Sequence, residues 1–421
     1  MKRIEPSSVI ILAGVTAALS IGKLPPAMPV LRDSLHLSLV QAGFLLSLVQ
    51  LAGMTLGLAM GLLADGIGHK RSMVTGLLVL CAAGVLGGFA TDVPSLLALR
   101  ALEGVGLLMA CMPAPGLLRQ VVAPARLGTT LGVWGACMPF GVTVALLFGP
   151  GAVAAVGWQG WWWILAGAAL TMALWVARAV PARVARTRVA STVHHSCVTR
   201  LRLTLSARGP WLVAGGFFLY SCQWLAVIGF LPIVYAQAGV AAGVAGALTA
   251  MAAAANIAGN VVSGRLLQRG MPPQRLLHIG FGVMGVGALL AFSALAASAG
   301  PLSPLIRYAG VLLFSAFGGL IPATLFVLAV KLAPGEHTVS TTVGWMQQCS
   351  AFGQLAGPPL IGWIAGAAGS WHWTWVFTGS CALAGMFVAA TLARSPAVEL
   401  DDRGWKGTAR MAGHITEGIA K

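Results

Sequence analysis

Apolar runs separated by short polar segments recur along almost the whole of this chain. Each run has roughly 20 residues, which is the length that an α-helix needs to cross the hydrocarbon core of a bilayer. We place the predicted membrane helices at 8–31, 38–63, 72–90, 94–122, 128–152, 160–180, 211–236, 241–264, 276–298, 303–332, 339–366 and 372–393. The pattern therefore predicts an all-α membrane protein with about twelve transmembrane helices.

The second half of the chain repeats residues of the first half in the same order. The spacing between matching residues drifts slowly upward, from 203 for Pro29 and Pro232 to 207 for Arg100 and Arg307. A parallel internal repeat is typical of secondary transporters, and it predicts two pseudo-symmetric six-helix bundles. We divide the chain into an N-terminal bundle (1–180), a basic cytoplasmic linker (181–210), a C-terminal bundle (211–393) and a cytoplasmic tail (394–421).

The composition favours burial in lipid over exposure to water. Hydrophobic residues make up 58% of the chain and charged residues only 9%, whereas a soluble domain carries about a quarter charged residues. The net charge of +16 does not indicate nucleic-acid binding, because Lys and Arg recur at the ends of apolar runs. With the N-terminus inside, the Lys and Arg residues within the membrane or outside are Lys23, Arg32, Arg100 and Arg307. This bias predicts a multi-pass protein with both termini in the cytoplasm.

The seven Cys residues do not indicate a disulfide framework, because they are odd in number and lie mostly within apolar runs. The sequence shows no phosphate-binding loop, metal-ligand spacing or nucleophile motif. We therefore expect a protein that is not an enzyme and holds no cofactor or metal. Its expected partners are the lipid bilayer and a small-molecule substrate, and we expect it to be monomeric.

A charged loop, GLLADGIGHKR starting at Gly61, joins the second and third predicted helices. Asp65 can accept hydrogen bonds from the adjacent helix N-terminus, while Lys70 and Arg71 hold the cytoplasmic side. If these contacts break when the halves move, the loop is a conformational gate formed by Gly61, Asp65, Gly68, Lys70 and Arg71. The alternative is a plain turn that carries cytoplasmic positive charge.

This loop resembles the signature of the major facilitator superfamily, G-x-L-a-D-r-x-G-r-k, with Gly66 where a basic residue is usual and His69 where Arg is usual. With the helix count and the repeat, the chain resembles a bacterial permease of that family over essentially its full length. The Trp-Gly-x-x-Met-Pro-x-Gly stretch at 134–141 and Lys23 resemble the branch that transports cyanate and nitroimidazoles. The resemblance implies a bacterial inner-membrane location and proton-coupled transport of a small solute, anions included, by alternating access.

Arg100 and Glu103 lie inside the fourth predicted helix, spaced i, i+3, so they share a face and can pair. An ionised side chain in hydrocarbon is costly unless it faces a cavity or a partner. In the family that the chain resembles, the Arg of this helix is linked to proton coupling or substrate contact. We predict that Glu103 and Arg100 couple a proton to transport; the alternative is a static ion pair that fixes helix packing.

Lys23 lies in the first helix at a depth comparable with that of Arg100. Because the first and fourth helices line the cavity in the family that the chain resembles, two cations at one depth favour an anionic or electron-rich solute. The alternative is that Lys23 extends to the outer headgroups. Arg307, the second-half counterpart of Arg100, either completes this site or sits at the outer interface.

Polar and aromatic residues within the helices supply the remaining predicted solute contacts, which are Trp134, Gln223 and Gln347. Interhelical hydrogen bonding and aromatic packing are the alternative roles for them. Two groups of tryptophans are expected to anchor the outer interface: Trp158, Trp161, Trp162 and Trp163 in the first half, and Trp371, Trp373 and Trp375 in the second.

Two other functions stay open at this point. A multidrug efflux antiporter that exchanges lipophilic compounds for protons is expected to need acidic cavity residues, and Lys23 and Arg100 argue against it. A non-transporting membrane receptor would not need a two-fold repeat with cations inside each half.

Overall fold

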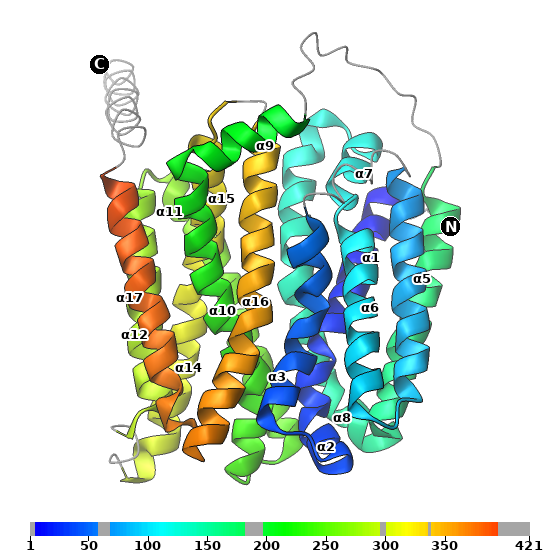
Figure 1. Cartoon of the computed structure of the whole chain (residues 1–421). Helices are drawn as coiled ribbons and strands as arrows, with labels where there is room; N and C mark the ends of the chain where they lie inside the picture. Colours follow the sequence, from blue (N-terminus) through cyan, green and yellow to red (C-terminus); the bar gives the residue numbers. More distant parts are fainter. Residues whose placement is uncertain (1–4, 58–67, 182–196, 295–299, 336–337, 395–421) are drawn as a thin grey trace, which may run out of the picture.

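The computed structural model of the chain describes residues 5–57, 68–181, 197–294, 300–335 and 338–394, and every regular element in these ranges is a helix. The long helices stand side by side along a common direction (Figure 1). Ten helices in the described ranges are long and apolar enough to cross a membrane. The prediction of an all-α membrane protein is confirmed.

The first half begins with two helices that form one membrane-spanning unit and are separated only by Lys23. Its elements are α1 (Pro6–Gly22), α2 (Leu24–Leu35), α3 (Leu39–Ser47), the 3₁₀ turn η1 (Leu48–Gln50), α5 (His69–Gly88), α6 (Val93–Cys111), α7 (Ala114–Val121) and α8 (Pro124–Ala179). The second membrane helix starts with α3 and continues past η1 to Gly57.

Two predicted membrane helices, 128–152 and 160–180, are joined in the single element α8. Gly157 interrupts it with φ 73° and ψ 170°, a conformation that Gly adopts without the penalty of a side chain. A Cβ atom placed on Gly149 would lie 3.7 Å from Cζ2 of Trp161. Residues twelve apart meet in this way only where the chain turns back, so α8 contains two membrane crossings.

The second half follows the same plan. Its elements are α9 (Cys197–Ser206), α10 (Arg208–Gln237), α11 (Ala242–Gln268), α12 (Pro273–Phe292), η2 (Gly300–Leu302), α14 (Ser303–Gly318), α15 (Leu320–Lys331), α16 (Val339–Ala368), η4 (Trp371–Trp373) and α17 (Thr374–Ala393). α16 is less apolar than the other long helices but has 30 residues and no charged side chain. With α16 and the two crossings of α8, the fold is consistent with two six-helix halves.

The repeat is visible in where the membrane helices break. The fourth helix is divided into α6 and α7, and the tenth into α14 and α15. Pro115 and Pro322, which the repeat pairs, each lie in the first turn of the second segment. Proline is tolerated there because the first turn of a helix has no intrahelical partner for its N–H groups.

The most extensive contacts between the two halves are those of α3 with α16, α8 with α11, and α2 with α10. The contact is close: a Cβ on Gly43 would lie 2.6 Å from the Pro358 carbonyl oxygen, and one on Gly246 would lie 2.4 Å from Cγ of Pro150. At the other end of the bundle, α7 and α15 make no comparable contact within the described residues. The halves are therefore held together most closely at the end of the bundle that carries α2.

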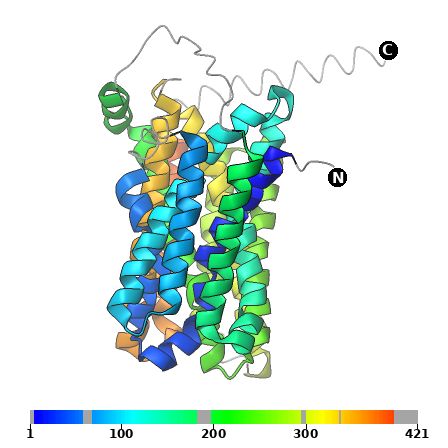
Figure 2. The same ribbon diagram turned by 90° about the vertical axis from the view of Figure 1, so that its right-hand side faces the viewer.

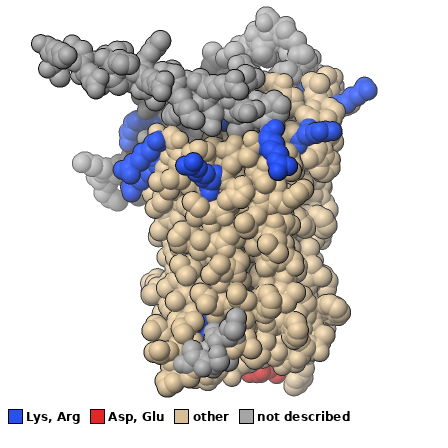
Figure 3. All heavy atoms as spheres, turned by 90° about the vertical axis from the view of Figure 1, so that its left-hand side faces the viewer, with Lys and Arg blue, Asp and Glu red and all other residues tan. Residues whose placement is uncertain are grey.

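Charge divides the two ends of the bundle. Lys and Arg gather at the end that carries α7 and α9, and acidic side chains appear at the opposite end on the face shown (Figure 3). The short helix α9 lies across the basic end (Figures 1 and 2). It falls within the predicted linker 181–210, of which residues 182–196 lie outside the described part.

Candidate functional site

Lys23 sits at the junction between α1 and α2, where it is only 2% exposed. Two prolines follow it, Pro25 and Pro26, and neither has an N–H to bond the preceding turn. The carbonyl of Ile21 therefore lacks the helical partner that residue 25 would supply. The junction places a lysine ammonium close to carbonyl groups that accept hydrogen bonds from side chains.

Glu103 lies on α6 and is shared by two cations. It accepts a hydrogen bond from Nζ of Lys23 and another from Nη1 of Arg100, the second at 2.5 Å. Arg100 and Glu103 are 3% and 2% exposed, so the whole ion-pair cluster is out of solvent. Buried charges of this kind are stable only when they are paired and their remaining hydrogen-bonding groups are satisfied.

Arg100 uses its other N–H groups on main-chain carbonyls of two neighbouring helices. Nη1 also donates to Ser20 O over 2.5 Å, Nη2 to Ile21 O over 3.5 Å, and Nε to Leu45 O over 3.0 Å. Leu45 precedes the change from α-helix to the 3₁₀ turn η1, and such changes leave carbonyls without regular partners. Arg100 thus ties α6 to the breaks in the first and second membrane helices.

Two tryptophans complete the cluster from the sixth membrane helix. Trp161 Nε1 donates to the Lys23 carbonyl over 3.2 Å, and Lys23 Nζ lies 4.5 Å from the ring centroid of Trp162. The second contact is a cation–π interaction. Trp158, Trp161 and Trp162 are all buried, so the prediction that these three anchor the membrane interface is wrong. Trp163 beside them is exposed, as is Trp373 in the second half.

The cluster is closed in this structure. The gap beside it is lined by leucines, by Trp162, and by Arg100 and Glu103, and it has no room for a water molecule. Because the gap is closed, a proton or a solute can reach the cluster only after the surrounding helices move. Two cations and one carboxylate give the cluster one net positive charge.

The other predicted solute contacts do not join this cluster. Trp134 packs over Gly14 of α1, since a Cβ there would fall 2.3 Å from the indole ring. Gln223 is fully buried in α10. It lies two helical turns from Gly216 on the same face, and the side chains next to Gly216 come from α15 and α17. Gln347 is exposed.

Arg307 is half-buried in α14 and makes no ion pair with any described residue. Arg100, its counterpart in the repeat, is fully paired. The prediction that Arg307 completes the cation site remains untested, but the structure does not bring it to Lys23.

The predicted gate lies only partly within the described residues, because Gly61 and Asp65 fall outside them. Gly68, with φ 92°, precedes α5 and begins the helix. Lys70 Nζ donates to the Ala177 carbonyl over 2.7 Å, which joins the start of α5 to the end of α8. A cation at a helix C-terminus is favourable because of the partial negative charge there. Arg71 is exposed.

The second half holds a neutral hydrogen-bond network in its core, nearer the α15 end than the position of Arg307, because Ser315 lies eight residues past Arg307 on α14. Asn256 Nδ2 donates to Tyr220 Oη over 3.0 Å and to Ser315 O over 2.9 Å, and Asn260 Nδ2 donates to Asn256 Oδ1 over 3.1 Å. Trp224 Nε1 donates to Ser315 Oγ over 3.2 Å. The sequence shows these residues as polar groups in apolar runs, but not that they converge.

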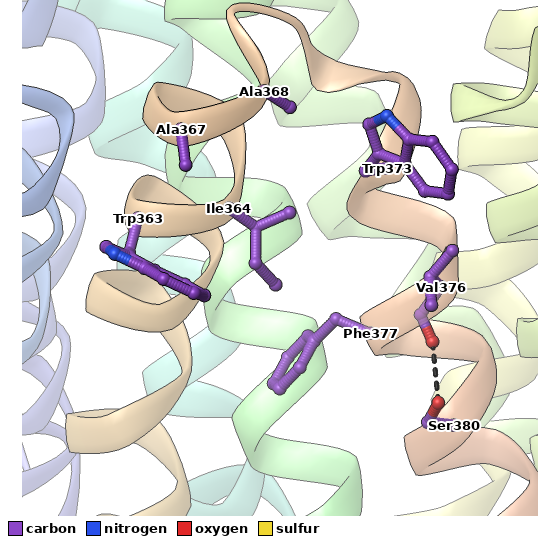
Figure 4. A pocket seen from close by; sticks show the side chains of 8 residues that line it. All are labelled: Trp363, Ile364, Ala367, Ala368, Trp373, Val376, Phe377 and Ser380. Carbon is purple, nitrogen blue, oxygen red and sulfur yellow. Dashed lines mark hydrogen bonds between the residues drawn. The ribbon is translucent and has the colours of Figure 1, made fainter.

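An apolar groove of about 500 Å³ lies on the outer surface, between α16 and α17. Trp363, Ile364 and Phe377 line it, with Trp373 beside the turn that joins the two helices (Figure 4). Ser380, its polar side chain, already donates to Val376 O over 2.8 Å. The groove offers no unpaired polar group, and it is remote from the charge cluster.

Comparison with known proteins agrees with this architecture. The family model described as Major Facilitator Superfamily matches residues 10–343 and 213–416. The fold is similar to that of a D-xylose–proton symporter (TM-score 0.73, 16% identity, 91% of this chain and 96% of that one). It is also similar to a bacterial homologue of the human lysosomal transporter Spinster in an inward-facing, unoccupied conformation (TM-score 0.68, 16% identity, 96% and 98%).

The fold thus defines a polytopic membrane transporter. The chain belongs to the major facilitator superfamily, and it is a secondary transporter rather than an enzyme.

Two curated relatives match shorter segments. Myo-inositol transporter 2 of Cryptococcus neoformans var. grubii is 28% identical over 165 residues, 38% of this chain. The tetracenomycin C resistance and export protein of Streptomyces glaucescens is 25% identical over 133 residues, 32% of this chain. The matched segments span only 29% and 25% of those relatives, so they do not establish a substrate for this chain.

Proposed function

We propose that this protein couples proton movement to the transport of a small polar solute by alternating access, with Glu103 as the proton-carrying group. The observation that supports the proposal is that one buried carboxylate is shared by Lys23 and Arg100, which come from different membrane helices. Protonation of Glu103 would remove both salt bridges and leave two buried cations facing each other. The cluster would then have to open or recruit an anion, which links protonation to helix movement.

The net positive charge of the cluster favours an anionic or electron-rich solute once the surrounding helices separate. This agrees with the resemblance to the cyanate and nitroimidazole branch, which remains a hypothesis. Export of lipophilic compounds is the second candidate, supported by the segment that resembles an export protein. In that case the cluster would exchange protons without contacting the solute.

We infer that the basic end of the bundle faces the cytoplasm, because membrane proteins concentrate Lys and Arg on that side. Since the halves are joined at the α2 end and least connected at the α7 end, the structure would then be an inward-facing state. A bacterial inner membrane and a monomeric state complete the proposal. Reporter fusions at both termini test the orientation, and two termini on opposite faces would contradict it.

The decisive experiment measures uptake of candidate anions into proteoliposomes under an imposed pH gradient. Glu103→Gln is expected to abolish gradient-driven accumulation while retaining solute exchange across the membrane at equal pH. Asp33→Asn is the matched control, because Asp33 is an exposed carboxylate at the α2 end. Accumulation that survives in Glu103→Gln would remove Glu103 from coupling.

Loss of folding must be separated from loss of coupling, since Glu103→Gln leaves two cations short of a partner. The double variant Lys23→Gln/Glu103→Gln removes one charge of each sign and keeps the net charge of the cluster. A structural role predicts that the double variant regains both stability and gradient-driven accumulation. A coupling role predicts that it regains stability alone. Retained anion binding in Lys23→Ala would remove Lys23 from the proposed anion site.

A further inference from the structure

A chain of side-chain hydrogen bonds crosses the interface between the two halves. Gln50 Nε2 donates to Gln354 Oε1 over 2.9 Å, and Gln354 Nε2 donates to Ser350 Oγ over 3.3 Å. The hydroxyl groups of Ser350 and Ser221 lie 2.6 Å apart and join α16 to α10. One connected polar chain therefore runs from the second membrane helix into the core of the second half.

This chain starts next to the charge cluster. Gln50 is the last residue of η1, and Leu45, five residues earlier on the same helix, accepts from Arg100 Nε. α6 also presses on η1 directly, because a Cβ on Gly104 would lie 2.4 Å from the Val49 carbonyl oxygen. A 3₁₀ segment within a longer helix often marks a hinge. Here η1 is held by Arg100 and α6 on one side and by α16 on the other.

We propose that Gln50 and Gln354 are positioning residues that transmit the charge state of Glu103 to the interface between the halves. The inference rests on the proposed proton-coupling function. While Glu103 is ionised it holds Arg100 against the Leu45 carbonyl, and Gln50 meets Gln354. When Glu103 takes up a proton, Arg100 loses that anchor and releases the carbonyl.

Release of the Leu45 carbonyl allows η1 to return to α-helical bonding. A 3₁₀ helix advances about 120° per residue and an α-helix about 100°, so three residues differ by roughly 60°. A rotation of that size turns Gln50 away from Gln354 and breaks their hydrogen bond. The second hydrogen bond across this part of the interface, from Gln348 Nε2 to Met54 O over 2.6 Å, also joins neutral groups. The interface can therefore separate without the cost of moving a charge through it.

The rest of the α3–α16 interface differs in kind. A Cβ on Gly362 would lie 2.4 Å from the Leu39 carbonyl oxygen, and Gly43 approaches Pro358 just as closely. These contacts depend on main-chain packing and have no link to Arg100. The part of the interface around Gly43 and Gly362 is therefore expected to stay closed when the part around Gln50 opens, and it serves as an internal reference.

Hydrogen–deuterium exchange of the full-length protein in nanodiscs tests the inference. The variants are Glu103→Gln, Gln50→Met and the double variant. Each single substitution is expected to raise exchange in residues 48–57 and 346–356 roughly tenfold, the equivalent of one lost hydrogen bond, without affecting residues 39–44. In the double variant the two effects do not multiply, because both act on the same link.

Gln237→Met is the matched control, since Gln237 Oε1 accepts from Trp371 Nε1 over 2.6 Å within the second half. It should leave both interface segments protected. If Gln50→Met unfolds the protein, exchange will rise in every segment. Gln354→Met then replaces it, alone and in combination with Glu103→Gln.

Two results would overturn the inference: exchange factors that multiply in the double variant, or interface segments that stay protected in Glu103→Gln. The second result together with lost gradient-driven accumulation would leave the proposed function standing and remove only the relay. If Glu103→Gln retains gradient-driven accumulation while the exchange factors do not multiply in the double variant, the proposed proton coupling fails. The link between Arg100 packing and the Gln50–Gln354 pair would then operate without protons.

Discussion

The two halves of this transporter share a fold but fill their cores with different chemistry. In the first half, Lys23, Arg100 and Glu103 form a buried ion cluster, whereas in the second half Tyr220 and Asn256 anchor a neutral hydrogen-bond network. Residues 211–393 contain a single acidic residue, Glu336, which lies outside the predicted helices. The repeat supplied two copies of one scaffold, and within the predicted helices acidic side chains occur in only one of them.

Arg100 and Arg307 make this contrast specific. Both occupy the same position in the repeat, but only Arg100 has a carboxylate one helical turn away, so only Arg100 is fully buried. An arginine without such a partner must keep contact with a polar environment, because burying an unpaired charge is costly. One acidic residue therefore decides which half holds a charged core.

The largest effect is expected from Glu103→Met, which leaves Lys23 and Arg100 buried without a counter-charge. Stability should fall by about 3–5 kcal/mol, the usual cost of removing one member of a buried ion pair. Thermal unfolding of purified protein in detergent measures it. A midpoint equal to that of the wild type would show that the cluster does not stabilise the first half.

A smaller effect is expected from Asn256→Leu in the neutral network. The substitution leaves the buried Tyr220 hydroxyl without its amide partner, at a cost of about 1–3 kcal/mol, while the Ser315 carbonyl still accepts from Gly319 N–H. The same unfolding assay reports this loss, and transport at varied pH should keep the wild-type pH profile. A shifted profile would contradict the division of chemistry between the halves.

The smallest effect is expected from Arg307→Gln, because a half-buried side chain without an ion pair in the described residues contributes little to stability. The change should stay within about 0.5 kcal/mol. Anion binding measured by ligand-dependent thermal shift is the sharper readout, and reduced binding would restore Arg307 to the solute site. Unchanged binding would confine that site to the first half.

Sequence reasoning located the central residues of the cluster but not their partners. Arg100 and Glu103 could be paired from their i, i+3 spacing, since helical geometry alone brings them together. Lys23 was predicted at a similar depth as a free cation for an anionic solute. In the structure its ammonium is bound to Glu103, 80 residues away, a contact that no local pattern reveals.

The tryptophans show the same limit. Their position near the ends of apolar runs predicted interface anchors, yet Trp162 lies against the Lys23 ammonium. A turn at Gly157 directs this segment back into the bundle. Whether an aromatic residue near a helix end meets lipid headgroups or a buried cation depends on how the neighbouring helices pack.

The apolar periodicity, the internal repeat and the distribution of Lys and Arg were enough to predict an all-α, multi-pass transporter, because a bilayer imposes helix length and composition directly on the chain. The tertiary structure decided which polar groups are paired. Lys23 with Glu103, Arg100 with Leu45 and Gln50 with Gln354 are contacts between helices far apart in sequence. Their formation depends on packing angles and helix breaks that hydropathy does not encode.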